Sequence, residues 1–101
     1  MSNVKHQLDE RKRGKFTVAG GPGQSGEMDV AVINDSLVVY HTEVTAAAEG
    51  KGFAMQMLDA MVAYAMDHRL KVVPHCIYVL AQFKRHPEKY RNVWTPGDKI
   101  K

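Results

Sequence analysis

The sequence lacks the features that mark membrane, secreted and disulfide-stabilised proteins. It contains no run of about 20 apolar residues, so it predicts no transmembrane helix. Its first 15 residues are polar and charged and do not resemble a secretory signal. Cys76 is the only cysteine, which excludes an intramolecular disulfide and fits a reducing compartment. We therefore expect an intracellular, cytoplasmic protein with no membrane contact.

Signs of metal or nucleic-acid binding are also scarce. The five histidines show no metal-ligand spacing, and one cysteine cannot build a structural zinc site, so we expect no metal. The net charge is +3 with a pI near 9.1, but no basic stripe with interleaved aromatics and no zinc-finger or helix-turn-helix pattern occurs. Nucleic acid is therefore an unlikely partner, and the charge fits either solubility or a site for an anionic ligand.

The composition is that of one globular domain. The chain has 101 residues, of which 45% are hydrophobic and 25% charged, enough for a single core. Residues 1–14 are polar and aperiodic and predict a flexible N-terminal segment. Residues 15–94 carry the apolar patterns and form the expected domain, and residues 95–101 form a polar tail.

The order of apolar patterns predicts the fold class. Alternating or β-branched residues predict strands over 15–19, 27–33 and 37–44, joined by a Gly/Pro-rich loop at 20–26 and a turn at 34–36. From Phe53 to about His68 the apolar spacing is that of an amphipathic helix. A short strand over 70–74 and a helix over 76–85, ended by His86-Pro87, follow. We expect an α+β (α/β) fold: a mostly antiparallel sheet with a parallel β-α-β unit and two helices.

The segment between the third strand and the long helix carries the clearest functional signal. Gly50, Lys51 and Gly52 lie in a loop that leads into a helix N-terminus, where free N–H groups and the helix dipole favour phosphate. Glycines let a pyrophosphate approach the backbone, and Lys51 adds positive charge. The loop is neither a P-loop nor a dinucleotide fingerprint. The alternative is a glycine turn that starts a helix and binds no ligand.

Several strings together resemble a known family. These strings are His41-Thr42-Glu43-Val44, Gly50-Lys51-Gly52-Phe53-Ala54, Leu70-Lys71-Val72-Val73-Pro74-His75-Cys76, Tyr78-Val79 and His86-Pro87-Glu88. They are similar to the short GNAT-type N-acetyltransferase domains sometimes called the YjdJ type, over about residues 15–90. The resemblance implies a minimal GNAT-like fold without the N-terminal helices of full-length members, and acetyl-CoA (coenzyme A) as the cofactor.

The resemblance also implies a binding mode. The cofactor would lie between the strand that ends at Val44 and the strand over 70–74, bonded by the backbone of Glu43 and Val44 and by the glycine-loop amides. The implied cofactor-binding residues are Thr42, Glu43, Val44, Gly50, Lys51, Gly52, Phe53 and Ala54. The wider superfamily usually has Arg or Gln three residues before the first glycine. Here that residue is Ala47, which weakens the expected phosphate affinity unless Lys51 compensates.

Two mechanisms remain open for acetyl transfer. In the first, Cys76 is a nucleophile that takes the acetyl group and passes it to an amine, for which its thiolate is needed. His75 is its neighbour but points to the other face of a strand, so His41 is the better candidate activator. In the second, Glu43 or His41 removes the amine proton and Tyr78 protonates the leaving thiolate. The alternative is that none of these candidates is catalytic. Glu43, His41 and Tyr78 would then be structural, and Cys76 would be a small buried apolar residue.

The family resemblance also predicts the binding partners. We expect acetyl-CoA and an amine acceptor, either a small molecule or a protein lysine. The alternative is a non-catalytic CoA-binding or protein-interaction module, because no acceptor groove is evident. Lys84, Arg85 and Lys89 are candidates to meet the 3′-phosphate of CoA, although a solvated basic face is the simpler interpretation.

Overall fold

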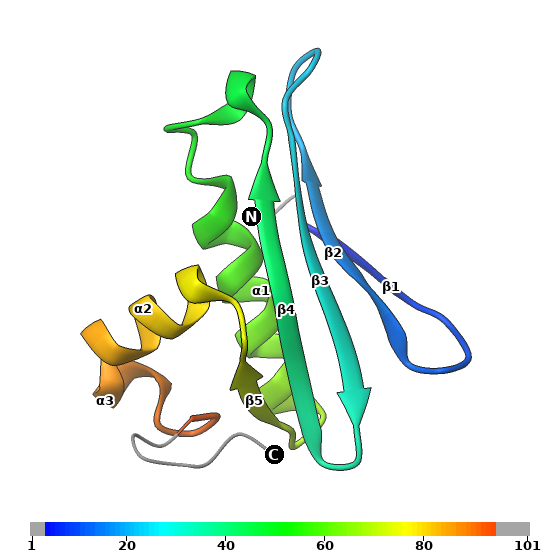
Figure 1. Cartoon of the computed structure of the whole chain (residues 1–101), viewed down its shortest axis with the longest axis vertical. Helices are drawn as coiled ribbons and strands as arrows, with labels where there is room; N and C mark the ends of the chain where they lie inside the picture. The colour runs from blue at the N-terminus through cyan, green and yellow to red at the C-terminus, as the bar shows by residue number, and fades with distance from the viewer. Residues whose placement is uncertain (1–3, 95–101) are drawn as a thin grey trace.

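A five-stranded sheet forms the centre of the protein. The computed structural model describes residues 4–94, and the predicted tail at 95–101 lies outside this range. The sheet order is β1-β2-β3-β4-β5, the order of the chain (Figure 1). The strands are β1 Lys5–Leu8, β2 Arg13–Ala19, β3 Ser25–Ile33, β4 Ser36–Val44 and β5 Lys71–Pro74. The helices are the 3₁₀ turn η1 Ala46–Ala48 and α1 Phe53–Asp67, α2 Ile77–Arg85 and α3 Pro87–Tyr90.

Strands β2, β3 and β4 form the antiparallel meander that the sequence predicts. Phe16 pairs with Met28, and Met28 pairs with Thr42, so these three side chains share one face. The β3–β4 connection is tight because Asn34 adopts a left-handed conformation with φ 55°, which asparagine tolerates better than most residues. β2 and β3 each begin two residues earlier than predicted.

Strand β1 is the element that the sequence did not predict. Lys5–Leu8 pairs antiparallel with β2, from Lys5 opposite Thr17 to Leu8 opposite Gly14. The expectation that residues 1–14 form no regular structure is therefore wrong for this stretch. The prediction failed because three of the four β1 residues are exposed, so backbone pairing rather than an apolar pattern defines the strand.

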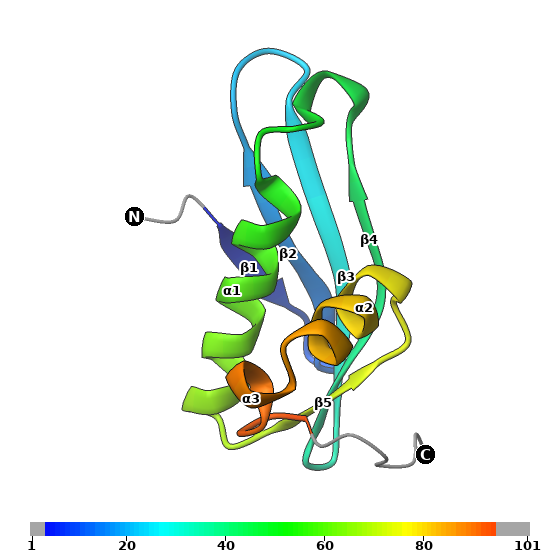
Figure 2. The same cartoon turned by 90° about the vertical axis from the view of Figure 1, so that its left-hand side faces the viewer.

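Helix α1 covers one face of the sheet, and α2 and α3 lie at the β5 edge (Figures 1 and 2). The inward stripe of α1 contains Met57, Leu58 and Met61, each fully buried. They pack in one core cluster with the inward side chains of the strands. α1 returns the chain to β5, which pairs parallel with β4 and completes the predicted β-α-β unit.

The C-terminal part of the domain closes the core at the sheet edge. Val79 and Phe83 of α2 are buried, as predicted, and the apolar patch of Tyr90, Val93 and Trp94 joins the same cluster. α2 ends before Pro87, and Pro87 then starts the single turn of α3, where its missing N–H costs nothing. The predicted α+β fold with a mixed sheet is therefore confirmed, and the structure adds one short helix, α3.

Candidate functional site

Strands β4 and β5 separate part of the way along their length. Their pairing runs from Ser36 opposite Lys71 to Val39 opposite Pro74 and then stops. At that point the N–H groups of His75 and Cys76 both donate to the Val39 carbonyl, at 3.0 Å each. The remainder of β4 continues without β5 beside it, and we name the region where the two strands part the opening (Figure 1).

A β-bulge on β4 lies where the opening begins. Asp29 of β3 pairs with His41 and the next residue, Val30, pairs with Val39, so Tyr40 is an extra residue on β4. Bulges bend a strand and re-aim its side chains, and they are common beside functional sites. The bulge therefore directs the last part of β4 away from β5.

The backbone of β4 offers hydrogen-bonding groups to this opening. The Thr45 N–H donates to the Ser25 carbonyl at 2.9 Å, so Thr45 faces β3. Because N–H and C=O groups alternate sides along an antiparallel strand, those of Thr42 and Val44 face the opening. Those of Glu43 face β3. An extended ligand in the opening would thus meet the backbone of Thr42 and Val44, and Glu43 would contribute its side chain only.

The glycine loop has the geometry that a phosphate site requires. Gly50 and Gly52 have φ of 79° and 78°, a left-handed conformation that favours glycine. A Cβ added at either position would meet no atom within 4 Å, so the space above the loop is open.

The start of α1 also leaves donors for an anion. The first helical bond runs from the Gln56 N–H to the Gly52 carbonyl, and Gly52 provides no side-chain cap. The N–H groups of Phe53 and Ala54 therefore precede the first bonded donor of the helix. No acidic side chain lies in the first turn. The Lys51 N–H is already bonded to the Ala48 carbonyl, so Lys51 has only its ammonium to offer.

Cys76, Thr42 and Tyr78 lie on the α1 side of the opening. The Cys76 thiol donates to the Thr42 hydroxyl at 3.2 Å, and Cys76 is 6% exposed at the start of α2. Burial raises the pKa of Tyr78 above its ordinary value, and the neighbouring ionisable groups of Tyr90, Asp59 and Cys76 raise it further. Tyr78 thus stands near Cys76 as a protonated phenol, as an acid in this position requires.

His41 and Glu43 lie on the other face of β4. They are two residues apart on one strand, so they share a face, and Thr42 between them points to the opposite one. His41 Nε2 lies 3.3 Å from Glu43 Oε1, with both side chains largely exposed. The structure thus joins His41 to Glu43 and Cys76 to Thr42. It does not bring His41 to the thiol as an activator.

Three side chains near the opening were not among the predicted site residues. Tyr40 and Ile77 are exposed apolar residues on either side of the β4–β5 junction. Tyr90 is buried with a hydroxyl that no group in the described range satisfies. The sequence placed Tyr40 in a predicted strand, Ile77 in a predicted helix and Tyr90 in an apolar patch, and only their exposure and hydrogen bonding single them out.

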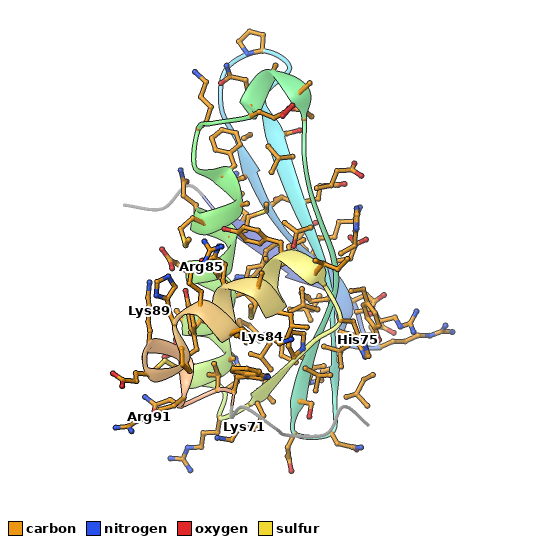
Figure 3. All side chains as sticks on the ribbon, turned by 60° about the vertical axis from the view of Figure 1, so that its left-hand side comes forward. Lys71, His75, Lys84, Arg85, Lys89 and Arg91 are labelled. Carbon is orange, nitrogen blue, oxygen red and sulfur yellow. The ribbon has the colours of Figure 1, made fainter. Side chains whose placement is uncertain are left out.

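The basic residues of α2 and α3 form a surface away from the sheet face. Arg85, Lys84 and Lys89 project from α2 and α3, while His75 lies at the sheet end of this region (Figure 3). Within residues 4–94, Lys84 and Arg85 make no ion pair, and Lys89 lies over the Tyr90 ring at 5.3 Å from its centroid. This arrangement is compatible with a solvated face and with a phosphate contact alike.

Metal sites and membrane-spanning helices were the two other features sought in the described part of the chain. Over residues 4–94 no three His, Cys, Asp or Glu side chains gather as a metal site. Nor does this range contain a helix with the length and apolar character needed to span a bilayer.

Comparison with known proteins identifies the family. A family model described as GCN5-related N-acetyl-transferase matches residues 15–93, and no curated protein matches the chain. The fold is similar to the NMR solution structure of a "GCN5-like putative N-acetyltransferase" from Staphylococcus aureus. The TM-score is 0.64 at 22% sequence identity, covering 97% of this chain and 94% of the other. The family match covers most of β2, the strands β3 to β5, the glycine loop and all the helices described above in one continuous segment, without distinguishing the YjdJ subtype. The chain therefore belongs to the GCN5-related N-acetyltransferase family.

Proposed function

We propose that this protein binds acetyl-CoA and transfers its acetyl group to an amine. The observation that carries the proposal is the β4–β5 opening, which runs toward an uncapped helix N-terminus behind two left-handed glycines. An opening lined by free strand backbone suits an extended pantetheine chain. A glycine loop with open space above it suits a pyrophosphate. Acetyl-CoA supplies the acetyl group as a reactive thioester.

The residues of the opening fit this cofactor. The N–H and C=O groups of Thr42 and Val44 would bond the pantetheine as an added strand. The amides of Gly52, Phe53 and Ala54 and the Lys51 ammonium would hold the pyrophosphate, with Gly50 shaping the loop. Ala47 is exposed on η1 and carries no group that could assist, so the loop backbone and Lys51 would provide most of the phosphate contact.

The placement of the titratable groups favours direct transfer. Glu43, with His41 as its partner, would accept a proton from the amine on one face of β4. Tyr78 would donate a proton to the departing sulfur on the other face. Direct transfer needs one group that accepts the amine proton and another that protonates the leaving sulfur, and β4 with α2 supplies a candidate for each. Cys76 has a hydroxyl partner and, among residues 4–94, no contacting base, which favours a packing role over a nucleophilic one.

Cofactor binding and turnover test the proposal separately. Thermal unfolding would be followed with acetyl-CoA, with CoA and with ATP as the control. A ligand at 100 times its dissociation constant adds about 2.7 kcal/mol, which raises the midpoint of a domain this size by roughly 10 °C or more. Mass spectrometry of amine acceptors incubated with acetyl-CoA would then detect the acetylated product.

The outcomes separate the two functions that the sequence left open. Stabilisation by acetyl-CoA and CoA but not ATP, with an acetylated amine, supports the enzyme. Stabilisation without any transfer supports a CoA-binding module instead. The absence of stabilisation at millimolar acetyl-CoA would contradict both and leave a protein-interaction module.

A further inference from the structure

Apolar and aromatic side chains remain exposed beside the proposed reaction centre. Ile77, next to Cys76, is 85% exposed, and Tyr40 at the bulge is 42% exposed. The Tyr40 ring lies parallel to the His75 ring, with the planes 4° apart and the centroids 6.1 Å apart. Exposed large apolar side chains beside a site mark a surface for another molecule. We name Tyr40, His75 and Ile77 the apolar platform.

On the sheet face opposite α1, the part formed by β3 and β4 carries negative charge, whereas β1 and β2 add Lys5, Arg13 and Lys15 farther from the opening. Glu27 pairs with Glu43 and Asp29 pairs with His41, so these side chains share the face that α1 does not cover. We name Glu27, Asp29 and Glu43 the carboxylate row. Between residues 27 and 50 the chain has five carboxylates and no Lys or Arg. Within residues 4–94 no helix packs on this face.

One lysine of the chain already lies on this face. Lys15 Nζ lies 3.0 Å from Glu27 Oε1 and 4.0 Å from Asp29 Oδ1. The hydrogen bond and the charge of Glu27 raise the pKa of Lys15, so its ammonium is favoured there. Glu43, nearer the opening, contacts His41 and no lysine in the described range. The face thus binds an ammonium at Glu27 and Asp29, and Glu43, whose charge also acts on Lys15 from a distance, has no lysine of residues 4–94 in direct contact.

Taken with the proposed acetyl transfer, on which it rests, this arrangement identifies the acceptor. We propose that the acceptor is a lysine side chain in an extended protein segment, which lies across the carboxylate row with apolar neighbours on the apolar platform. The negative charge of the carboxylate row complements the lysine ammonium. The apolar platform complements the apolar side chains that flank this lysine in the segment. Tyr40 and Ile77 stay open to solvent, so the surface suits a protein segment better than a small amine, which needs an enclosing pocket.

The charge of the remaining surface supports this orientation. Between residues 69 and 91 the chain has six Lys or Arg residues and one carboxylate, and they gather on β5, α2 and α3 (Figure 3). A cationic acceptor is therefore repelled from α2 and α3 and attracted to the sheet face. In the reaction the ammonium first loses one proton. Its nitrogen then forms the amide bond to the acetyl carbon, the carbon–sulfur bond breaks, and the thiol leaves with a proton, so one proton is released overall.

The test uses the full chain with acetyl-CoA and a blocked peptide that contains Leu-Gly-Lys-Gly-Leu. The same peptide with norleucine in place of lysine is the peptide control, and spermidine is the competing small acceptor. Acetylated product is measured by mass spectrometry as a function of acceptor concentration. The variants are Glu27→Gln with Asp29→Asn, Ile77→Ser and Lys15→Gln. The matched control is Asp67→Asn, which removes an exposed charge at the end of α1.

The expected changes lie in KM for the peptide. Loss of the two carboxylates raises KM about 5-fold, the scale of exposed ion pairs. Ile77→Ser raises it by a similar factor through lost apolar contact. Lys15→Gln lowers KM about 2-fold, because it frees Glu27 and Asp29 for the incoming ammonium. In all three variants kcat changes by less than about 2-fold, since none of these groups is assigned to proton transfer. Asp67→Asn leaves both KM for the peptide and kcat unchanged.

The outcomes that would overturn the inference differ from those that would overturn the proposed function. If acetyl-CoA stabilises the protein and spermidine is acetylated with the higher kcat/KM, the acceptor assignment is wrong and the acetyltransferase stands. A peptide KM that does not respond to the carboxylate variant would also overturn the assignment. If acetyl-CoA neither stabilises the protein nor acetylates any amine, the proposed function itself fails.

Discussion

Replacing Gly52 by alanine separates the backbone role of the glycine loop from its role in phosphate binding. Gly52 has φ 78°, and an added Cβ meets nothing within 4 Å, so Gly52→Ala causes strain without a clash. A left-handed alanine costs about 1–2 kcal/mol. For a domain of this size that lowers the unfolding midpoint by roughly 5–15 °C.

The effect on the cofactor follows from the position of the new methyl group. It occupies the space through which a phosphate would approach the α1 amides, and a lost charge-assisted hydrogen bond is worth about 1.5–3 kcal/mol. Affinity for CoA should fall roughly 10- to 100-fold. At a CoA concentration 100 times the wild-type dissociation constant, stabilisation then drops from about 2.7 kcal/mol to between about 0.4 and 1.4 kcal/mol.

Gly23 provides the matched control. It lies in the β2–β3 loop with φ 75°, and a Cβ there also meets nothing within 4 Å. Gly23→Ala therefore carries the same backbone strain away from the α1 N-terminus and should keep the full stabilisation by CoA. Differential scanning fluorimetry of both variants, with and without CoA, measures the two effects. If Gly52→Ala retains the wild-type CoA shift, or if Gly23→Ala loses it equally, the phosphate site is not at this loop.

Four further predictions concern residues at or near α2 and α3. Tyr78→Phe should lower kcat about 100-fold while CoA still stabilises the protein, because a positioned acid contributes at least that factor; wild-type kcat in steady-state assays would contradict this. Since the folded pKa of Tyr78 is raised, the unfolded chain ionises first, and stability should fall as the pH rises above about 10. Urea titrations should show a weaker decline in Tyr78→Phe. Cys76→Ala should keep kcat within about 3-fold and leave no acetyl adduct to detect at the thiol; a loss of 100-fold or more would restore Cys76 as the nucleophile. Tyr90→Phe removes a buried hydroxyl for which residues 4–94 offer no partner, and it should stabilise the protein by about 1 kcal/mol in urea unfolding; destabilisation would show that the hydroxyl has a partner.

Local patterns predicted most of the fold because they report on burial. The alternation in β3 and β4 and the helical spacing from Phe53 mark side chains that the structure buries in one core. Strand β1 was missed for the same reason. Its residues gain backbone pairing with β2 and bury little, so no apolar pattern exists to find. The single turn of α3 was missed because Pro87 reads as a helix end, whereas here it also begins a helix.

The sequence by itself determined the glycine loop, the helix that follows it and the residue types that chemistry needs. Gly52 directly precedes the amphipathic run, and glycine has no side chain that could cap the helix. The sequence alone therefore indicated a helix start without a side-chain cap. Only the tertiary structure decided which of the chemical groups meet. Cys76 joins Thr42, 34 residues earlier, and His41 joins Glu43 on the opposite face. The Cys76–Thr42 contact depends on where β4 and β5 part, and the sheet face that His41 and Glu43 occupy depends on strand register, which the packing of the whole sheet fixes.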